Sequence, residues 1–305
     1  MPSTLPFHTA DAFATKPFSG NPASVIVFDE DDPRSTDEEF CQTLAVEFNL
    51  SETAFSTVQP GGTEEEPVYG LRWWTPGAEV PLCGHATLAT AHVLFSTRHP
   101  SAKQITFNTR FSGALRAARN ASDGSISLDF PAASLLVLED GHRRRPKIVE
   151  AVVKATGLGE ESVKAVAYVD AFDGAVVELG ADVDLEKLQV KTTEIGAAGK
   201  LVILTQPAPA ASGYTIYSRV FAPLLGIDED PVTGAAHAAL APFWLSTPSS
   251  ARLVSSADVV ASRTLRAKQV SKRGGEMDVV LDAAGKRVEL RGKARTVMRG
   301  EIELD

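Results

Sequence analysis

Two short segments hold the groups best suited to chemistry. The first, Pro81–Ala89, carries His85, and the second, Glu229–His237, carries Asp230. In each segment a glycine and small residues stand directly before an alanine-rich run that favours a helix. Such a helix start presents unpaired backbone N–H groups, with no bulky side chain to block a ligand. We therefore expect each segment to bind an acidic group beside its polar side chain.

The two segments correspond position by position. Gly84 corresponds to Gly234, and the alanines behind them recur at matching offsets, namely Ala86 with Ala236, Ala89 with Ala239 and Ala91 with Ala241. The chain therefore contains the same glycine- and alanine-rich motif twice. Two such helix starts facing each other would form a small cleft for an acidic small-molecule substrate, so the pattern indicates an enzyme.

Length and charge limit the class of protein. A length of 305 residues favours two domains, and a formal charge of −9 argues against a nucleic-acid partner. The basic cluster His142–Lys147 lies beside a proline and is interpreted as a solvated linker rather than a binding patch.

The cysteine count and the apolar runs bear on the compartment. Two cysteines, Cys41 and Cys83, are too few for a disulfide framework and favour a reducing compartment. The N-terminus lacks the basic and apolar segments of a secretory signal, and no apolar run is long enough to cross a bilayer. We therefore expect a cytoplasmic protein with no membrane partner.

Capping residues and apolar spacing predict the helices that would position these groups. Ser35 and Glu38 form a capping-box pattern ahead of a helix that ends at Asn49. The runs from about His85 to Ser96 and from Ala236 to Leu245 are too apolar for a surface, so each is expected to be enclosed by strands.

Strands outnumber helices in the remaining pattern. Two more helices are predicted, at Arg145–Gly157 and Asp184–Lys191. Strands are predicted at Thr9–Phe13, Ala23–Phe28, Ser51–Phe55, Gln104–Asn108, Ala114–Ala118, Ile126–Phe130, Val163–Val169, Ala175–Leu179, Lys200–Thr205, Tyr214–Val220, Arg266–Ser271, Met277–Asp282, Val288–Arg291 and Arg295–Arg299. The fold class is therefore α+β with a pseudo-repeat, and the boundary lies near residues 131–145.

The order of short motifs along the chain resembles that of the PhzF, or phenazine biosynthesis-like, family. The motifs are Phe18–Ala23, Asn49–Thr53, Leu71–Pro76, Cys83–Thr87, Glu229–Gly234, Gln269–Gly275 and Gly292–Ala294. The resemblance implies a diaminopimelate epimerase-like fold of two pseudo-symmetric halves, each a curved β-sheet or barrel around a central helix. It implies one domain over residues 1–130, completed by residues 295–305, and a second domain over residues 131–294. It also implies that the active site lies between the two domains and that the protein forms a homodimer.

Glu52 is the residue that the resemblance makes a general acid/base. A free glutamate titrates near about 4.3, and we expect partial burial to raise its pKa toward neutrality, where proton transfer is efficient. The alternative is a strand-end glutamate in solvent. In the family this glutamate moves a proton between carbons of a dihydroaromatic acid, which implies a cofactor-independent isomerase with no metal, nucleotide or flavin.

Two further polar residues accompany Glu52 in the implied catalytic set. His85 either orients the substrate, carries a second proton or structurally caps its helix. Asp230 resembles the family's second acidic residue and orients an amino or hydroxyl group, although an aspartate before Pro231 also suits a helix cap. Both roles of Asp230 are compatible.

The implied substrate contacts are four small residues. Ser51 offers a hydroxyl group, and Gly84 and Gly234 offer backbone N–H groups to a carboxylate. Ala235 stands where several family members have serine, so one hydroxyl donor is missing and the known phenazine-pathway substrate is placed in doubt.

Cys83 carries a rival interpretation. Epimerases and racemases of this fold use two thiols, but Pro231 and Val232 occupy the place of the second, and Cys41 lies on an apolar helix face as a core residue. The alternatives are therefore a one-sided epimerase or racemase using Cys83, or a non-catalytic binding protein on the same fold.

Other conspicuous side chains are interpreted as structural. His237 and His92 are expected to be hydrogen-bonded core or rim residues. Trp73 and Trp74 are neighbours on a strand and point to opposite faces, so we expect one in the core and the other at the cleft.

Overall fold

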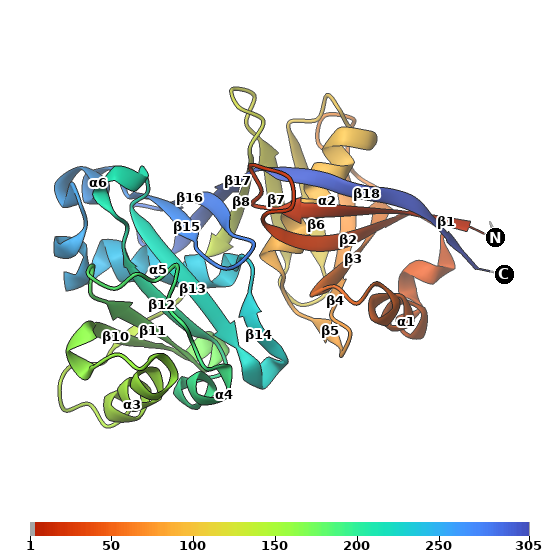
Figure 1. The fold of residues 1–305 in the computed structure, drawn as a ribbon. Coiled ribbons are helices and arrows are strands. Elements are labelled where there is room, and N and C mark those ends of the chain that lie inside the picture. Colours follow the sequence, from red (N-terminus) through yellow and green to blue (C-terminus); the bar gives the residue numbers. More distant parts are fainter. Residues whose placement is uncertain (1–3, 305) are drawn as a thin grey trace. The chain divides into compact units, whose positions relative to one another are not determined.

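The computed structural model describes residues 4–304 (Figure 1). The chain divides into two compact units. Unit 1 holds the residues up to Asp129 together with those from Arg291 onward, and unit 2 holds Phe130–Leu290. No helix within residues 4–304 is both long enough and apolar enough to span a membrane.

Unit 1 is a mixed sheet with two α-helices. Its elements are β1 (Thr4–Ala12), β2 (Asn21–Phe28), α1 (Glu38–Phe48), β3 (Glu52–Gln59), β4 (Val68–Trp74), β5 (Glu79–Val80), α2 (Gly84–Thr97), β6 (Gln104–Thr109), β7 (Ala114–Arg119) and β18 (Ala294–Glu303), and β8 (Ile126–Pro131) leads into unit 2. β1 pairs antiparallel with β2 and with β18. β2 pairs parallel with β3, β3 antiparallel with β4, β4 parallel with β6, and β6 antiparallel with β7.

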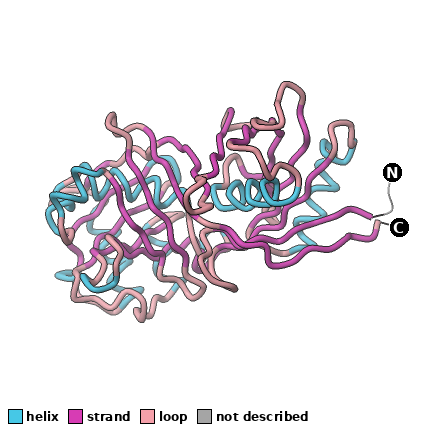
Figure 2. Tube along the Cα trace, turned by 90° about the horizontal axis from the view of Figure 1, so that it is seen from above, coloured by secondary structure: helices cyan, strands magenta, loops and turns pink. Residues whose placement is uncertain are grey.

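Helix α2 lies among the strands of unit 1. It packs against β1, β2, β3, β7 and β18. Figure 2 shows helices in cyan among the strands in magenta. Its alanine-rich sequence allows this, because small side chains let strands approach the helix on several sides, and most of its residues are buried. The sheet thereby fixes the start of α2 at Gly84.

Unit 2 shows the same order of strand pairings. Its elements are β9 (Leu136–Val137), α3 (Arg145–Thr156), β10 (Val163–Val169), β11 (Gly174–Leu179), α4 (Thr192–Ile195), β12 (Val202–Pro207), β13 (Ile216–Ala222), β14 (Ile227–Asp230), α5 (Gly234–Ser246), α6 (Ser256–Ser262), β15 (Thr264–Gln269), β16 (Gly275–Leu281) and β17 (Arg287–Gly292). β10 pairs antiparallel with β11, β11 parallel with β12, and β12 antiparallel with β13. β13 pairs parallel with β15, which pairs antiparallel with β16.

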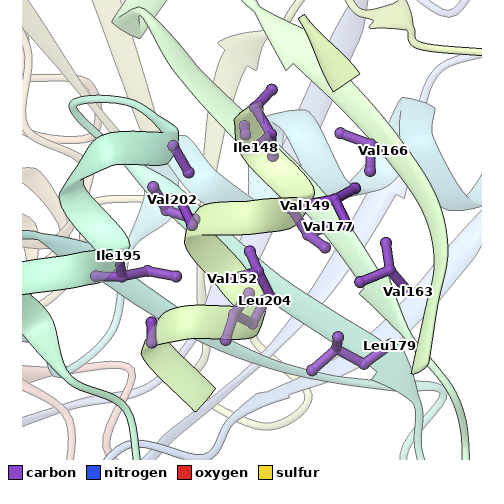
Figure 3. Packing of buried hydrophobic residues seen from close by; sticks show 14 of the residues in the cluster. Ile148, Val149, Val152, Val163, Val166, Val177, Leu179, Ile195, Val202 and Leu204 are labelled. Atoms are coloured by element: carbon purple, nitrogen blue, oxygen red, sulfur yellow. The ribbon is translucent and has the colours of Figure 1, made fainter. Parts of the chain in front are cut away.

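The core of unit 2 under α3 is rich in branched aliphatic residues (Figure 3). Ile148, Val149 and Val152 come from α3, and they meet valines and leucines of β10, β11 and β12. Full burial of each such side chain contributes roughly 1.5–3 kcal/mol. The first turn of α3 is therefore firmly attached to its sheet.

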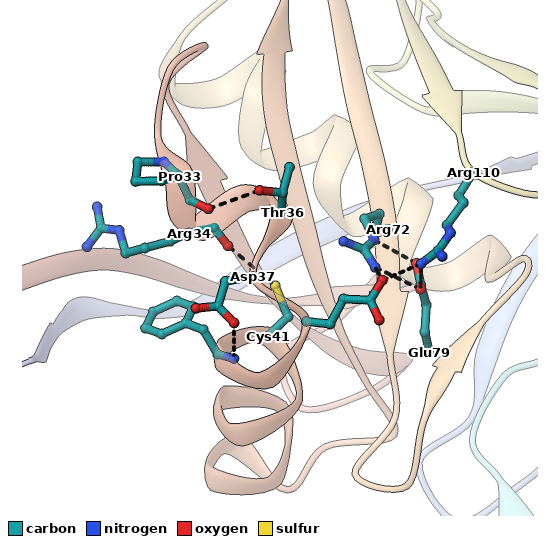
Figure 4. A network of polar contacts seen from close by, with 10 residues as sticks. Pro33, Arg34, Thr36, Asp37, Cys41, Arg72, Glu79 and Arg110 are labelled. Atoms are coloured by element: carbon teal, nitrogen blue, oxygen red, sulfur yellow. Dashed lines mark hydrogen bonds and ion pairs between the residues drawn. The ribbon is translucent and has the colours of Figure 1, made fainter.

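A polar network holds the segment before α2 in unit 1 (Figure 4). Arg72 on β4 donates two hydrogen bonds to the Glu79 carboxylate, at 2.7 and 2.9 Å, and Arg110 donates to the same carboxylate at 3.0 Å. Ser112 Oγ donates to the Pro81 carbonyl at 2.8 Å. These bonds fix β5 and the three residues that lead to Gly84.

The structure corrects two predictions about local elements and adds one helix. The cap of α1 is Asp37, whose carboxylate accepts from the Phe40 N–H at 3.0 Å (Figure 4), whereas Ser35 lies in a preceding 3-10 turn. Asn49 ends α1 in the left-handed conformation, as predicted. The segment Asp184–Lys191 forms turns instead of a helix, since the Asp184 carboxylate accepts from the Lys187 N–H. Helix α6 had no predicted counterpart.

The tryptophan pair also differs from expectation. Trp73 and Trp74 are only 2% and 6% exposed, so both side chains are buried. Trp74 packs in the cluster that α1 covers, and Cys41 belongs to the same cluster, as predicted. The alternation of faces was right, but both faces of β4 are covered.

Candidate active site

Glu52 and His85 meet at the start of α2. Glu52 is the first residue of β3, opposite Ala23 on the parallel strand β2, and His85 is the second residue of α2. His85 Nε2 lies 3.2 Å from Glu52 Oε2, and the side chains are 7% and 13% exposed. Oε2 nevertheless has no hydrogen-bond partner within residues 4–304. This oxygen is therefore paired with His85 by charge.

Three further side chains surround the His85 ring. Asn21 Nδ2 lies 3.3 Å from His85 Nδ1, and Cys83 Sγ lies 3.4 Å from the same nitrogen. Ser51 Oγ lies 3.4 Å from His85 Nε2 and donates to Asn21 Oδ1 at 3.3 Å. Both ring nitrogens are thus held in place.

Asn21 was not predicted as a site residue. It lies within the Phe18–Ala23 motif, but an asparagine in a Gly-Asn-Pro sequence reads as a turn residue. It is fully buried at the first position of β2, where its amide reaches two predicted site residues. Membership of the motif was the only signal for it.

The electrostatics of the pair correct the expected pKa of Glu52. Burial raises the pKa of this carboxyl, but the charge of His85 and close polar contacts with His85, Ser51 and Cys83 outweigh burial and lower it. Burial lowers the pKa of His85, whereas the negative charges that Cys83 and Glu52 carry when ionised raise it well above its ordinary value. When Cys83 is a neutral thiol, the Glu52 carboxylate is the charge that keeps His85 protonated. The two groups therefore stand as a carboxylate and an imidazolium near neutral pH.

Cys83 is a protonated thiol in this setting. Burial, and then the nearby Glu52 charge, raise its pKa above the ordinary value of 9.0. A thiol is a poor base because the thiolate is the reactive form. The site thus favours Glu52 over Cys83 as the group that removes a proton.

The same three side chains could hold a metal ion. One ligand atom from each of Glu52, Cys83 and His85 lies within 4.8 Å of the others. A carboxylate, a thiolate and an imidazole form a donor set that suits Zn²⁺.

Asp230 lies in unit 2, at the end of β14, and is 8% exposed. Thr233 Oγ1 donates to its carboxylate, and Gln269 Nε2 donates to its carbonyl at 2.6 Å. The Thr233 N–H donates to Gln269 Oε1 at 3.0 Å. The cap position of α5 is Thr233, so the helix-cap interpretation of Asp230 is wrong: Pro231, Val232 and Thr233 separate it from the helix.

His237 has the structural role predicted for it. It is fully buried, its Nδ1 lies 2.7 Å from the Thr233 carbonyl, and its Nε2 lies 3.4 Å from Ser218 Oγ. Burial lowers its pKa to about 4, so the ring is neutral and Nδ1–H donates to that carbonyl. His92 Nε2 lies 3.1 Å from Thr296 Oγ1 on β18.

The predicted substrate contacts occupy comparable places in the two units. Gly84 and Gly234 are the first residues of α2 and α5, and neither helix start has a side-chain cap. Ser51 is half-buried beside Glu52, and Ala235 is exposed on the first turn of α5. Unit 1 brings together Glu52, His85 and Ser51, and the shared cleft with the Asp230 segment stays a prediction.

Comparison with known proteins identifies the family. The sequence pattern of the family described as phenazine biosynthesis-like protein (PhzC-PhzF) matches residues 10–300. The chain belongs to this family. The mouse phenazine biosynthesis-like domain-containing protein 2 is 39% identical over 98% of this chain and 99% of its own. An uncharacterized isomerase of Halalkalibacterium halodurans is 36% identical over 99% of both chains.

Solved structures of family members share the fold. The PhzF family protein of Enterococcus faecalis is 31% identical, with a TM-score of 0.78 over 98% of this chain and 99% of its own. A probable proline racemase of Agrobacterium radiobacter has a TM-score of 0.54 at 12% identity, which shows likeness of fold alone. The predicted family and the epimerase-like α+β fold class are thus confirmed.

Proposed function

We propose that this PhzF-family protein is a cofactor-independent isomerase that moves a proton between two carbons of a small acidic substrate. The observation that carries the proposal is the buried Glu52–His85 pair. A carboxylate held ionised beside an imidazolium can act as the base toward a substrate C–H group. Relatives named as isomerases support the same class of reaction.

Glu52 acts first as a base in this proposal. Its lowered pKa keeps it ionised in the resting site, ready to accept the proton from a substrate carbon. Once protonated beside the imidazolium of His85, the carboxyl group is a strong acid that returns the proton to another carbon. The proton and the electron pair both stay within substrate and Glu52, so the cycle needs no external reductant or oxidant.

The remaining site residues position the substrate. Ser51 and the backbone N–H groups at Gly84 and Gly234 would bind its carboxylate, since unoccupied helix starts favour anions. Asp230, fixed by Thr233 and Gln269, would accept a hydrogen bond from an amino or hydroxyl group. Ala235 supplies no hydroxyl, which favours a substrate other than that of serine-bearing relatives. The proposal includes a homodimer as its assembly.

Proton exchange in deuterated water tests the proposal. The purified protein would be incubated with trans-2,3-dihydro-3-hydroxyanthranilic acid and a panel of small amino and aromatic acids, and deuterium at substrate carbons followed by NMR. We expect incorporation with the wild type, loss with Glu52→Gln, and no change with Glu64→Gln, an exposed loop residue of the same unit. Incorporation that persists in Glu52→Gln refutes Glu52 as the proton carrier.

The contact between Cys83 and His85 keeps the epimerase or racemase as a second candidate. It predicts exchange at a single α-carbon that survives Glu52→Gln and disappears in Cys83→Ser. A non-catalytic binding protein predicts that no panel member exchanges while ligand binding survives both substitutions. The three hypotheses therefore predict different effects of Glu52→Gln and Cys83→Ser on deuterium incorporation and ligand binding.

A further inference from the structure

A second hollow lies wholly within unit 2. It has a volume of about 1040 Å³, and the side chains around it include Arg143, Arg144, Lys147 and Lys200. Ligand pockets for small molecules commonly span about 300–1,000 Å³. The hollow is therefore large enough for an organic molecule and not only for a single ion.

More cationic than acidic side chains line the hollow. Two carboxylates line the hollow, and one of them, Asp173, is shared by Lys200 at 3.6 Å and by the Tyr168 hydroxyl, which donates to it at 2.6 Å. Arg143 and Lys147 make no ion pair within residues 4–304. Two positive charges thus remain without an anion in a protein whose formal charge is −9.

Contacts with regular structure hold Lys147 and Arg144 near the hollow, whereas Arg143 lies exposed in the turn before α3. Lys147 lies on the first turn of α3, next to Ile148, which is packed in the core of Figure 3 and also lines the hollow. Arg144 lies over the Tyr168 ring, with its guanidinium carbon 4.0 Å from the ring centroid. Such stacking fixes the plane of the guanidinium and its N–H donors.

Basic side chains gather at the start of α3. The helix has no acidic residue in its first turn and no side-chain cap. Cations at the positive end of a helix dipole are unfavourable, and an anion bound there is favourable. Arg143, Arg144 and Lys147 are exposed, as expected for a solvated segment, and they also line the hollow at the start of α3.

The opposite wall is small and apolar. A Cβ at Gly196 would lie 3.1 Å from Pro223 Cγ, so this glycine lets the turn at Pro223–Leu225 close against it. Pro223 and Leu224 both line the hollow, and Leu224 is 65% exposed. The hollow thus offers cations at one wall and an apolar surface at the other.

We propose that this hollow binds a small phosphorylated organic molecule. A phosphomonoester dianion matches the two unpaired cations, and Arg143 and Arg144 supply the planar N–H donors that phosphate oxygens accept. The apolar wall fits the organic part of the ligand. A nucleic acid is disfavoured by the overall acidic charge.

Calorimetric titration of the full-length protein at low salt tests this site. The probes are adenosine monophosphate, inorganic phosphate and adenosine, which separate the anion from the organic part. We expect the monophosphate to bind more tightly than inorganic phosphate, no binding of adenosine at the same concentration, and weaker binding as salt rises.

Substitutions locate the binding. The double variant Arg143→Gln, Lys147→Gln should lose at least tenfold in affinity for the monophosphate. Lys187→Gln, which removes an exposed lysine of the same unit, should leave the affinity unchanged. Equal binding by the double variant, no binding of either phosphate, or equal affinity for the two phosphates would each overturn the proposal. The readout is binding alone, so it is independent of the proton-exchange result.

Discussion

Replacement of His85 by glutamine should change the free energy of unfolding in a way that reveals whether the Glu52–His85 pair is charged. The variant keeps a polar side chain but leaves a nearly buried carboxylate without its cation. Breaking a buried ion pair from one side typically costs about 3–5 kcal/mol, and the 13% exposure of Glu52 favours the lower end. We therefore expect a loss of about 3 kcal/mol in the free energy of unfolding at pH 5.5.

The pH dependence of this loss has a definite sign. The lowered pKa of Glu52 contributes stability above its ordinary value of 4.5, and this contribution is lost as pH falls through the lowered pKa. The raised pKa of His85 contributes stability that is fully present below 6.5 and is lost as pH rises through the raised pKa. The difference between wild type and variant should thus be largest between these two values and smaller on both sides.

Urea unfolding at several pH values, followed by tryptophan fluorescence, measures the difference. Trp73 and Trp74 lie in unit 1 with the pair, whereas Trp244 lies in unit 2, so the comparison is made in a Trp244→Phe background. His142→Gln, in unit 2, serves as the control and should leave that transition unchanged. A loss that is constant from acid to alkaline pH, or a variant as stable as the wild type at pH 5.5, would refute an ion pair at this site.

Three further predictions follow from contacts in the two units. Asn21→Ala should slow proton exchange about tenfold, equivalent to one hydrogen bond of about 1.4 kcal/mol, because it removes the acceptor that holds Ser51 Oγ beside the Glu52–His85 pair. It should also shift the pH–rate profile, which a purely structural role would not do. Gln269→Ala should lower the free energy of unfolding by about 1–3 kcal/mol in urea titrations, because it strands the Asp230 carbonyl and the Thr233 N–H, and unchanged stability would contradict this. Zn²⁺ should inhibit exchange reversibly, and Cys83→Ala should weaken this inhibition at least tenfold, whereas equal inhibition of both proteins would exclude Cys83 as a ligand.

The family and most elements could be predicted from the sequence because they depend on local patterns. Alanine-rich runs predicted two buried helices, and Asn49 predicted the end of α1. The cap of α1 was misplaced because Ser35 and Asp37 are both good capping residues, and only the structure shows which carboxylate or hydroxyl faces the helix.

The sequence predicted which residues form the site better than it predicted their pKa values. The pKa of Glu52 was expected to rise, because burial can be guessed from sequence, whereas the position of His85 against its carboxylate cannot. Asn21 and Gln269 were missed for a similar reason, because both contact residues that are distant in the chain. Asn21 contacts a residue 64 positions away, and Gln269 contacts one 36 positions away. Their type gives no signal of a role that only folding creates.

The pairing of β18 with β1 has a consequence for the order of folding during synthesis. β1 opens the chain at Thr4, but its antiparallel partner begins only at Ala294. The ribosome therefore releases all of unit 2 before the edge of β1 can be covered, and unpaired strand edges invite association with other chains. Unit 2, which is one continuous segment of the chain, is expected to fold first, and unit 1, which needs residues from both ends, to fold last. Deletion of the final ten residues should then yield aggregation instead of a smaller folded protein.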